Sequence, residues 1–133
     1  MKTTHSAGQK PKHKFLNLFI LASKMSITAK ISIIHRLTGV LLFLLLPFLL
    51  FILQKSLTSI DIYSLLYSYM SCITAKIFYL LIIFAFVYHA TAGIRFLLLD
   101  LSCGINIKTA KVTSVIVIIL SLLLTFILGI LIW

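Results

Sequence analysis

Apolar residues in this chain are gathered into three long intervals that contain no charged side chain. Two intervals of 18 residues cover 37–54 and 77–94, and a third of 22 residues covers 112–133. An α-helix needs about 20 residues to cross a hydrocarbon layer of about 30 Å. The third interval has this length, and the first two reach it if their helices extend into the neighbouring apolar residues. The pattern therefore predicts three transmembrane helices, over about 31–54, 77–99 and 112–133.

The composition supports a membrane protein and excludes a water-soluble domain. Hydrophobic residues make up 62% of the 133 residues and charged residues only 11%. Soluble domains are about 45–50% apolar and about 25% charged. Too few charged side chains are present to cover the surface of a water-soluble fold. We therefore expect an all-α membrane protein, and we expect no nucleic acid partner despite the net charge of +10.

The residues needed for several kinds of chemistry are missing from the chain. Its only acids are Asp61 and Asp100, so a pair of catalytic carboxylates is not expected. No phosphate-binding glycine motif occurs. Cys72 and Cys103 lack the spacing of a zinc site or a redox pair, and we interpret them as apolar filling residues.

The distribution of basic residues predicts the orientation of the chain in the membrane. Seven Lys and Arg precede the first span and three lie between the second and third, against two between the first and second. Basic residues accumulate on the cytoplasmic side of membrane proteins. We therefore expect residues 1–30 to form a basic cytoplasmic segment (or its equivalent in a mitochondrial matrix) ahead of a three-helix anchor over 31–133. The aromatic residues expected at the opposite interface are Tyr63, Tyr67, Tyr69 and Trp133.

Two shorter features add detail to the three predicted helices. The apolar stretch Phe15–Ala22 is eight residues long, and no small-residue cleavage site follows it. We interpret it as an interfacial segment rather than the core of a signal peptide. Pro47 lies in the middle of the first span and predicts a kink there.

A first polar cluster lies where the first span enters the membrane. Ser32 and Arg36 are about 40° apart around a helix, and His35 lies about 60° to the other side of Ser32. A hydroxyl, an imidazole and a cation thus share one face, and Gly39 leaves room for a group to approach the backbone. This set suits a carbonyl compound that becomes negative on reduction, or a carboxylate such as a haem propionate. Alternatively, His35 and Arg36 extend to the lipid headgroups and Ser32 bonds to its own helix.

A second cluster centres on a histidine deep in the second span. His89 lies six residues, or about 9 Å, deeper along the helix than Arg95, and Gly93 is one turn away on the same face. A histidine next to a glycine offers a flat macrocycle one nitrogen for iron and no side chain to block the ring. Alternatively, His89 hydrogen-bonds to a hydroxyl or carbonyl of a neighbouring helix. We expect His35 to lie nearer the surface than His89, so a second deep iron ligand would have to come from another polypeptide.

In order and spacing, these clusters resemble one family of respiratory proteins. The two motifs resemble those of the cytochrome b556 subunits of succinate dehydrogenase, which are membrane anchors of respiratory complex II. Where many members of this family have a histidine after Gly-Ile-Arg, this chain has Phe96. The resemblance covers 25–133 and rests on Ser32, His35, Arg36, Thr38, Gly39, His89, Gly93, Ile94, Arg95 and Asp100.

The resemblance implies a multi-pass subunit of the inner (cytoplasmic) membrane that catalyses nothing on its own. Its implied partners are a second three-helix anchor, an iron–sulfur subunit and a flavoprotein subunit, and its implied ligands are haem b and a quinone. By resemblance, His89 is the axial ligand of a haem shared with the second anchor. His35 and Gly93 then lie beside the haem, and Ser32 and Arg36 contact the quinone.

Two alternatives to this function stay open at the level of sequence. The chain could anchor a fumarate reductase or another dehydrogenase with a b-type cytochrome, because an anchor does not set the direction of the reaction. It could also be a small cationic membrane protein without a cofactor, in line with its size and basic N-terminal segment.

Overall fold

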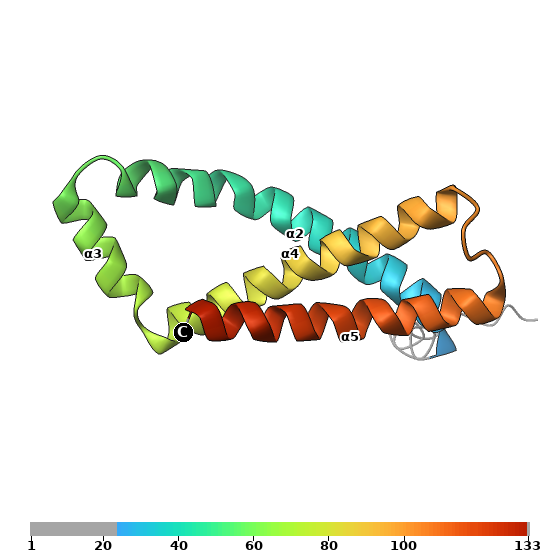
Figure 1. Ribbon diagram of the computed structural model, residues 1–133. Coiled ribbons are helices and arrows are strands. Elements are labelled where there is room, and N and C mark those ends of the chain that lie inside the picture. Colours follow the sequence, from blue (N-terminus) through green and yellow to red (C-terminus); the bar gives the residue numbers. More distant parts are fainter. Residues whose placement is uncertain (1–23, 133) are drawn as a thin grey trace, which may run out of the picture.

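A computed structural model describes residues 24–132 of the chain as helices joined by short connections (Figure 1). Our expectations for residues 1–23 of the basic segment, which include Phe15–Ala22, and for Trp133 concern residues outside this described part. The helices of the described part are α2 (Ile27–Ser56), α3 (Ile60–Met70), α4 (Ile73–Asp100) and α5 (Ile107–Ile132).

Serine side chains cap the N-termini of α2 and α3. The hydroxyl of Ser26 accepts a hydrogen bond from the backbone N–H of Ala29 at the start of α2 (3.4 Å). The hydroxyl of Ser59 caps α3 in the same way, with the N–H of Ile62 as donor (3.2 Å). Such caps satisfy backbone donors that have no partner inside the helix. Between α4 and α5, the turn contains Gly104 with a φ of 81°, a conformation that glycine adopts without strain.

Three of the described helices are long and apolar enough to cross a membrane, namely α2, α4 and α5. The described residues of the spans expected at 31–54, 77–99 and 112–133 lie inside these helices. Each helix begins before its charge-free interval, because a helix can continue through the interfacial region where lysine and arginine are tolerated. The chain is thus an all-α, multi-pass membrane protein.

The three long helices are packed unevenly. α4 and α5 lie side by side, and α2 crosses α4 obliquely in its first half (Figure 1). The small buried core lies near this crossing and consists of Ile31, Tyr88, Ala92 and Val117. The hydroxyl of Tyr88 donates to the backbone carbonyl of Ile31 (3.2 Å) and so ties α4 to the start of α2.

Hydroxyl side chains occupy the buried face of α5. Ser114, Ser121 and Thr125 are buried, and each donates a hydrogen bond to a carbonyl one turn earlier in its own helix. The hydroxyl of Ser121 also lies 2.7 Å from the hydroxyl of Thr91 on α4. Small and hydroxyl residues allow membrane helices to approach closely and to hydrogen-bond across their interface. This face therefore explains why α5 packs on α4 more extensively than on α2.

Most apolar side chains of the long helices point outward. In the most apolar 18-residue window of each helix, the share of buried residues is 6% for α2, 22% for α4 and 17% for α5. Such exposure would be unfavourable in water and is the normal state of a lipid-facing surface. Among the three long helices of residues 24–132, α2 is the least buried.

The connection from α2 to α4 contains a helix that we did not predict from the sequence. α3 has no buried residue, and its Tyr63 and Tyr67 rings lie one turn apart with centroids at 6.4 Å. Asp61 in its first turn favours the helix through the helix dipole. Because α3 joins the end of one long helix to the start of the next, it lies at one end of the three spans (Figure 1). In α2, the helix continues through Pro47 and changes direction along its length (Figure 1).

Candidate functional site

The two polar clusters singled out in the sequence meet where α2 crosses α4. The first three turns of α2 carry Ser32, His35 and Arg36, and the second half of α4 carries His89 and Gly93. His35, His89 and Gly93 are half-buried at this crossing, as is Ser32, whereas the Arg36 side chain is exposed. The crossing thus brings together residues that are more than fifty positions apart in the chain.

The side chains of His35 and His89 are in direct contact. Their rings stack with centroids 4.2 Å apart and planes 7° from parallel. We expected His35 to lie nearer the surface than His89, and this expectation was wrong, because the oblique crossing places the two rings at one level. Sequence position gives the distance of a residue along its own helix, but it does not give the point or the angle at which two helices cross.

Each of the two rings packs against a glycine of the opposite helix. A Cβ atom added to Gly39 would lie 2.8 Å from Cε1 of His89, and one added to Gly93 would lie 3.4 Å from Nε2 of His35. The absence of a side chain at Gly39 is therefore what lets His89 approach α2. We expected Gly39 to admit a group to the backbone, and that group is the His89 imidazole of the same chain.

Hydrogen bonds fix which nitrogen of His89 carries the proton. Nδ1 lies 3.1 Å from the backbone oxygen of His35 and 3.3 Å from Oγ1 of Thr38. A carbonyl oxygen can only accept, so Nδ1 must be the protonated nitrogen. The Thr38 hydroxyl lies 2.9 Å from the carbonyl oxygens of Ile34 and His35, so it can donate to one of them and accept from Nδ1. In the neutral ring, Nε2 then carries the lone pair.

This arrangement includes the alternative that we considered for His89 from the sequence, a bond to a neighbouring hydroxyl or carbonyl. The bond is made by Nδ1, on the far side of the ring from Nε2. Histidines that bind metals commonly donate their other N–H to a carbonyl, which fixes the tautomer and the ring orientation. The hydrogen bonds of His89 are therefore compatible with a metal at Nε2.

An apolar groove lies beside His89, between the middle parts of α2 and α4. Its volume is about 600 Å³. The residues that line it are apolar except for His89, which has an ionisable side chain. The described residues contain no cluster of three or more potential metal ligands. The groove is lined chiefly by Leu42, Phe43, Leu46, Phe86 and Ala90.

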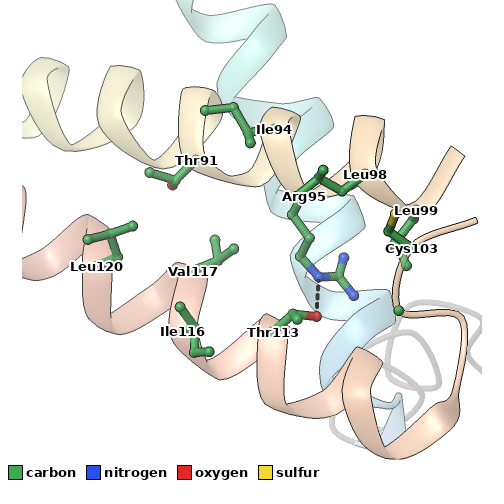
Figure 2. A pocket seen from close by; sticks show the side chains of 11 residues that line it. Thr91, Ile94, Arg95, Leu98, Leu99, Cys103, Thr113, Ile116, Val117 and Leu120 are labelled. Carbon is green, nitrogen blue, oxygen red and sulfur yellow. Dashed lines mark hydrogen bonds between the residues drawn. The ribbon is translucent and has the colours of Figure 1, made fainter. Parts of the chain in front are cut away.

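Arg95 has an environment that the sequence did not reveal. The residue is buried between α4 and α5, with its Nε donating to Oγ1 of Thr113 (3.1 Å) and Nη2 to the carbonyl of Ala110 (3.2 Å) (Figure 2). The Phe96 ring lies 5.2 Å from the guanidinium carbon and also 5.2 Å from the centroid of His35. Phe96 is thus close both to the arginine and to the histidine pair.

The fold and the site together define a class of protein. The chain is a three-span α-helical membrane protein with a histidine of fixed tautomer facing an apolar groove at a helix crossing. The chain belongs to the succinate dehydrogenase/fumarate reductase transmembrane subunit family, which it matches over residues 9–128.

Curated relatives of the chain carry names that agree with this family. It is 35% identical over 108 residues to the succinate dehydrogenase cytochrome b556 subunit of Rickettsia felis, with 79% of this chain and 82% of the relative covered. The protein of the same name from Rickettsia prowazekii is 34% identical over 105 residues, with the same coverage. The succinate dehydrogenase cytochrome b560 subunit of Reclinomonas americana is 36% identical over 110 residues, covering 78% of this chain and 76% of the relative.

Proposed function

We propose that this chain is a membrane anchor of succinate dehydrogenase, that it ligates haem b through His89, and that it forms part of a quinone site with Ser32 and Arg36. The observation that carries the haem proposal is the hydrogen bonding of His89, which leaves the Nε2 lone pair available for iron. Family membership and the names of the relatives support the anchor role.

The residues around His89 fit a haem group. The apolar groove offers a macrocycle the surroundings that it needs, and Nε2 offers the iron one ligand. His35 stacks on the flat face of the His89 ring, whereas a metal approaches Nε2 in the plane of the ring, so the stack leaves that direction open. When bound, haem b supplies one-electron chemistry. The described histidines are His35 and His89, and their rings stack face to face, so they cannot approach one iron from opposite directions. The second ligand is therefore proposed to come from a second three-helix anchor.

The residues proposed for the quinone lie at the end of α2 that carries the basic residues. A quinone gains two electrons and two protons on reduction to the quinol, and negative charge develops on its oxygens as the electrons arrive. The hydroxyl of Ser32 can donate a hydrogen bond to a quinone oxygen, and the exposed guanidinium of Arg36 can stabilise its developing charge. In the proposed assembly, an iron–sulfur subunit and a flavoprotein subunit supply electrons from succinate at this end.

We propose that this end faces the cytoplasm, and that the complex lies in the inner membrane. Ten of the twelve basic residues are on this side by the positive-inside rule. α3, with its exposed tyrosines, would then lie at the opposite interface. An anchor of a fumarate reductase is the second candidate, because the family description includes both enzymes. The relatives named above carry the name of succinate dehydrogenase, which favours the first.

The proposed haem ligation is tested by replacing His89 in the purified complex. We expect His89→Ala to abolish the reduced b-type absorption spectrum while the second anchor and both soluble subunits still co-purify. His35→Ala removes the other histidine of the crossing but keeps the backbone carbonyl that His89 bonds, so a b-type spectrum should still be seen if His89 and not His35 is the ligand. An unchanged spectrum in the His89 variant would falsify the ligand assignment. Identification of the co-purifying flavoprotein by mass spectrometry decides between the two dehydrogenases.

A further inference from the structure

A second groove lies between α4 and α5, near the turn that joins them (Figure 2). Its volume is about 410 Å³, and its walls are apolar side chains that include Ile94, Leu98, Ile116 and Leu120. Arg95 and Thr113 lie at its turn end (Figure 2). This groove is separate from the one beside His89. Arg95 follows His89 by six residues on α4, so the two side chains leave the helix in directions that differ by about 240°.

Arg95 is a buried cation with one nitrogen that makes no hydrogen bond. Its side chain is 6% exposed, and Nη1 has no hydrogen-bond partner within the described part of the chain. The other two nitrogens are held by Thr113 and Ala110. A charge at membrane depth is costly unless an opposite charge or a set of hydrogen bonds compensates it. One of the three donor nitrogens is thus left for a group outside these residues.

The chain itself offers almost no anion to pair with this arginine. Its only acids are Asp61 and Asp100. Asp61 is in α3, near the opposite end of the spans, and no ion pair between Asp100 and Arg95 occurs in residues 24–132. Lys108 and Lys111 are exposed in the first turns of α5, on the same side as Arg95, and they add positive charge there. An anion that pairs with Arg95 would therefore have to come from another molecule.

We propose that the groove binds an anionic phospholipid, with its phosphate on Arg95 and one acyl chain along the apolar walls between α4 and α5. Basic sites between membrane helices are known to hold anionic lipid headgroups. The apolar walls favour burial of an acyl chain, which a carboxylate of a partner protein would not use. Nη1 is closed to water in the lipid-free chain, so the guanidinium must turn toward the groove when the phosphate binds.

The proposal is tested with the full chain in detergent, after delipidation, by native mass spectrometry with added phosphatidylglycerol or phosphatidylcholine. We expect one phosphatidylglycerol to remain bound with an affinity at least about tenfold above that of phosphatidylcholine. Both lipids have an anionic phosphate, but phosphatidylcholine also brings the choline cation close to the guanidinium of Arg95, which opposes its binding. Arg95→Gln should remove this preference. Ile116→Trp should also lower retention, because it fills the groove and leaves the arginine in place.

Matched variants separate the lipid site from general effects of charge and bulk. Ile119→Trp makes the same change at an exposed residue of α5 outside the groove, and Lys111→Gln removes a surface charge, so both should retain the lipid as the wild type does. Equal retention of phosphatidylglycerol by wild type, Arg95→Gln and Ile116→Trp would overturn the proposal. Inorganic phosphate that displaces the lipid completely would also overturn it, since a free anion would then suffice. In the purified complex, loss of a partner subunit in Arg95→Gln together with unchanged lipid retention by the chain would also overturn it, since this would indicate a protein carboxylate.

Discussion

His35 and His89 stack on one another at the crossing of α2 and α4, and each ring packs against a glycine of the opposite helix. This reciprocal arrangement couples the position of the helices to the orientation of the proposed iron ligand. A side chain added at Gly39 therefore meets the proposed ligand directly, whereas one added at Gly93 meets the His35 ring that stacks on it.

Gly39→Ala should disturb the site strongly. The added Cβ would lie 2.8 Å from Cε1 of His89, and the ring is held in place by hydrogen bonds from Nδ1. We expect the ring or the helix to shift, at a cost of about 1–3 kcal/mol, and the haem content of the purified complex to fall. Haem content per complex is measured from the absorption spectrum and total protein.

Gly129→Ala is the matched control for this prediction. There the added Cβ would lie 2.9 Å from Cδ1 of Leu80, the far end of a flexible side chain that can turn away. Haem content should stay at the wild-type level. Equal haem content in both variants would show that Gly39 does not set the position of His89.

Thr38→Val should weaken haem binding without abolishing it. Valine has nearly the shape of threonine but cannot accept from Nδ1 of His89, which keeps its bond to the carbonyl of His35. Loss of such a supporting contact lowers affinity for a metal group by about tenfold or more. Titration of the apo-complex with haem measures the change. Thr125→Val removes a hydroxyl that bonds only within α5, and it should leave the affinity as it is.

Arg36→Leu and Ser32→Ala should separate the two half-reactions of the complex. Reduction of a soluble dye by succinate should be nearly unchanged, because it takes place in the soluble subunits. Reduction of quinone should fall by about a hundredfold in the arginine variant, since a donor to a developing negative charge is lost. Lys55→Leu removes a cation at the other end of α2 and serves as control. Parallel losses of dye and quinone reduction would rule out a quinone role for these residues.

Thr91 and Ser121 should contribute directly to the packing of α4 on α5. Their hydroxyl oxygens lie 2.7 Å apart, and Ser121 is fully buried. A double-mutant cycle with Thr91→Ala and Ser121→Ala should give a coupling free energy of about 0.6 kcal/mol, and at most about 1.7 kcal/mol. Unfolding of the chain in detergent measures it. A coupling of zero would mean that the hydroxyls make no net bond across the interface.

The three long helices could be predicted from the sequence because the cost of burying charge in lipid is so large. Charge-free intervals of 18 to 22 residues are a strong signal, and the residues of the two clusters were recognisable from their type and spacing. Helix α3 was not predicted, because a charge-free apolar interval marks only the long spans. Ser59 and Asp61 do carry the usual signals of a helix start.

Contacts between helices could not be predicted in the same way. Nothing in a single span states where another span crosses it, so the stack of His35 on His89 and the contact of Gly39 with the imidazole emerged only from the fold. For the same reason Arg95, which the sequence placed near the end of a span, turned out to be buried against α5. Rotation of a helix about its axis is set by its neighbours.

The sparse packing of α2 has a consequence for the lifetime of the chain in the cell. With 6% of its most apolar window buried, this helix gains little free energy from the rest of the chain. A newly inserted copy that meets no companion should open at α2 often, and open membrane proteins are removed by quality-control proteases. We expect its abundance to follow the supply of its companions, so that orphan copies are degraded and do not accumulate.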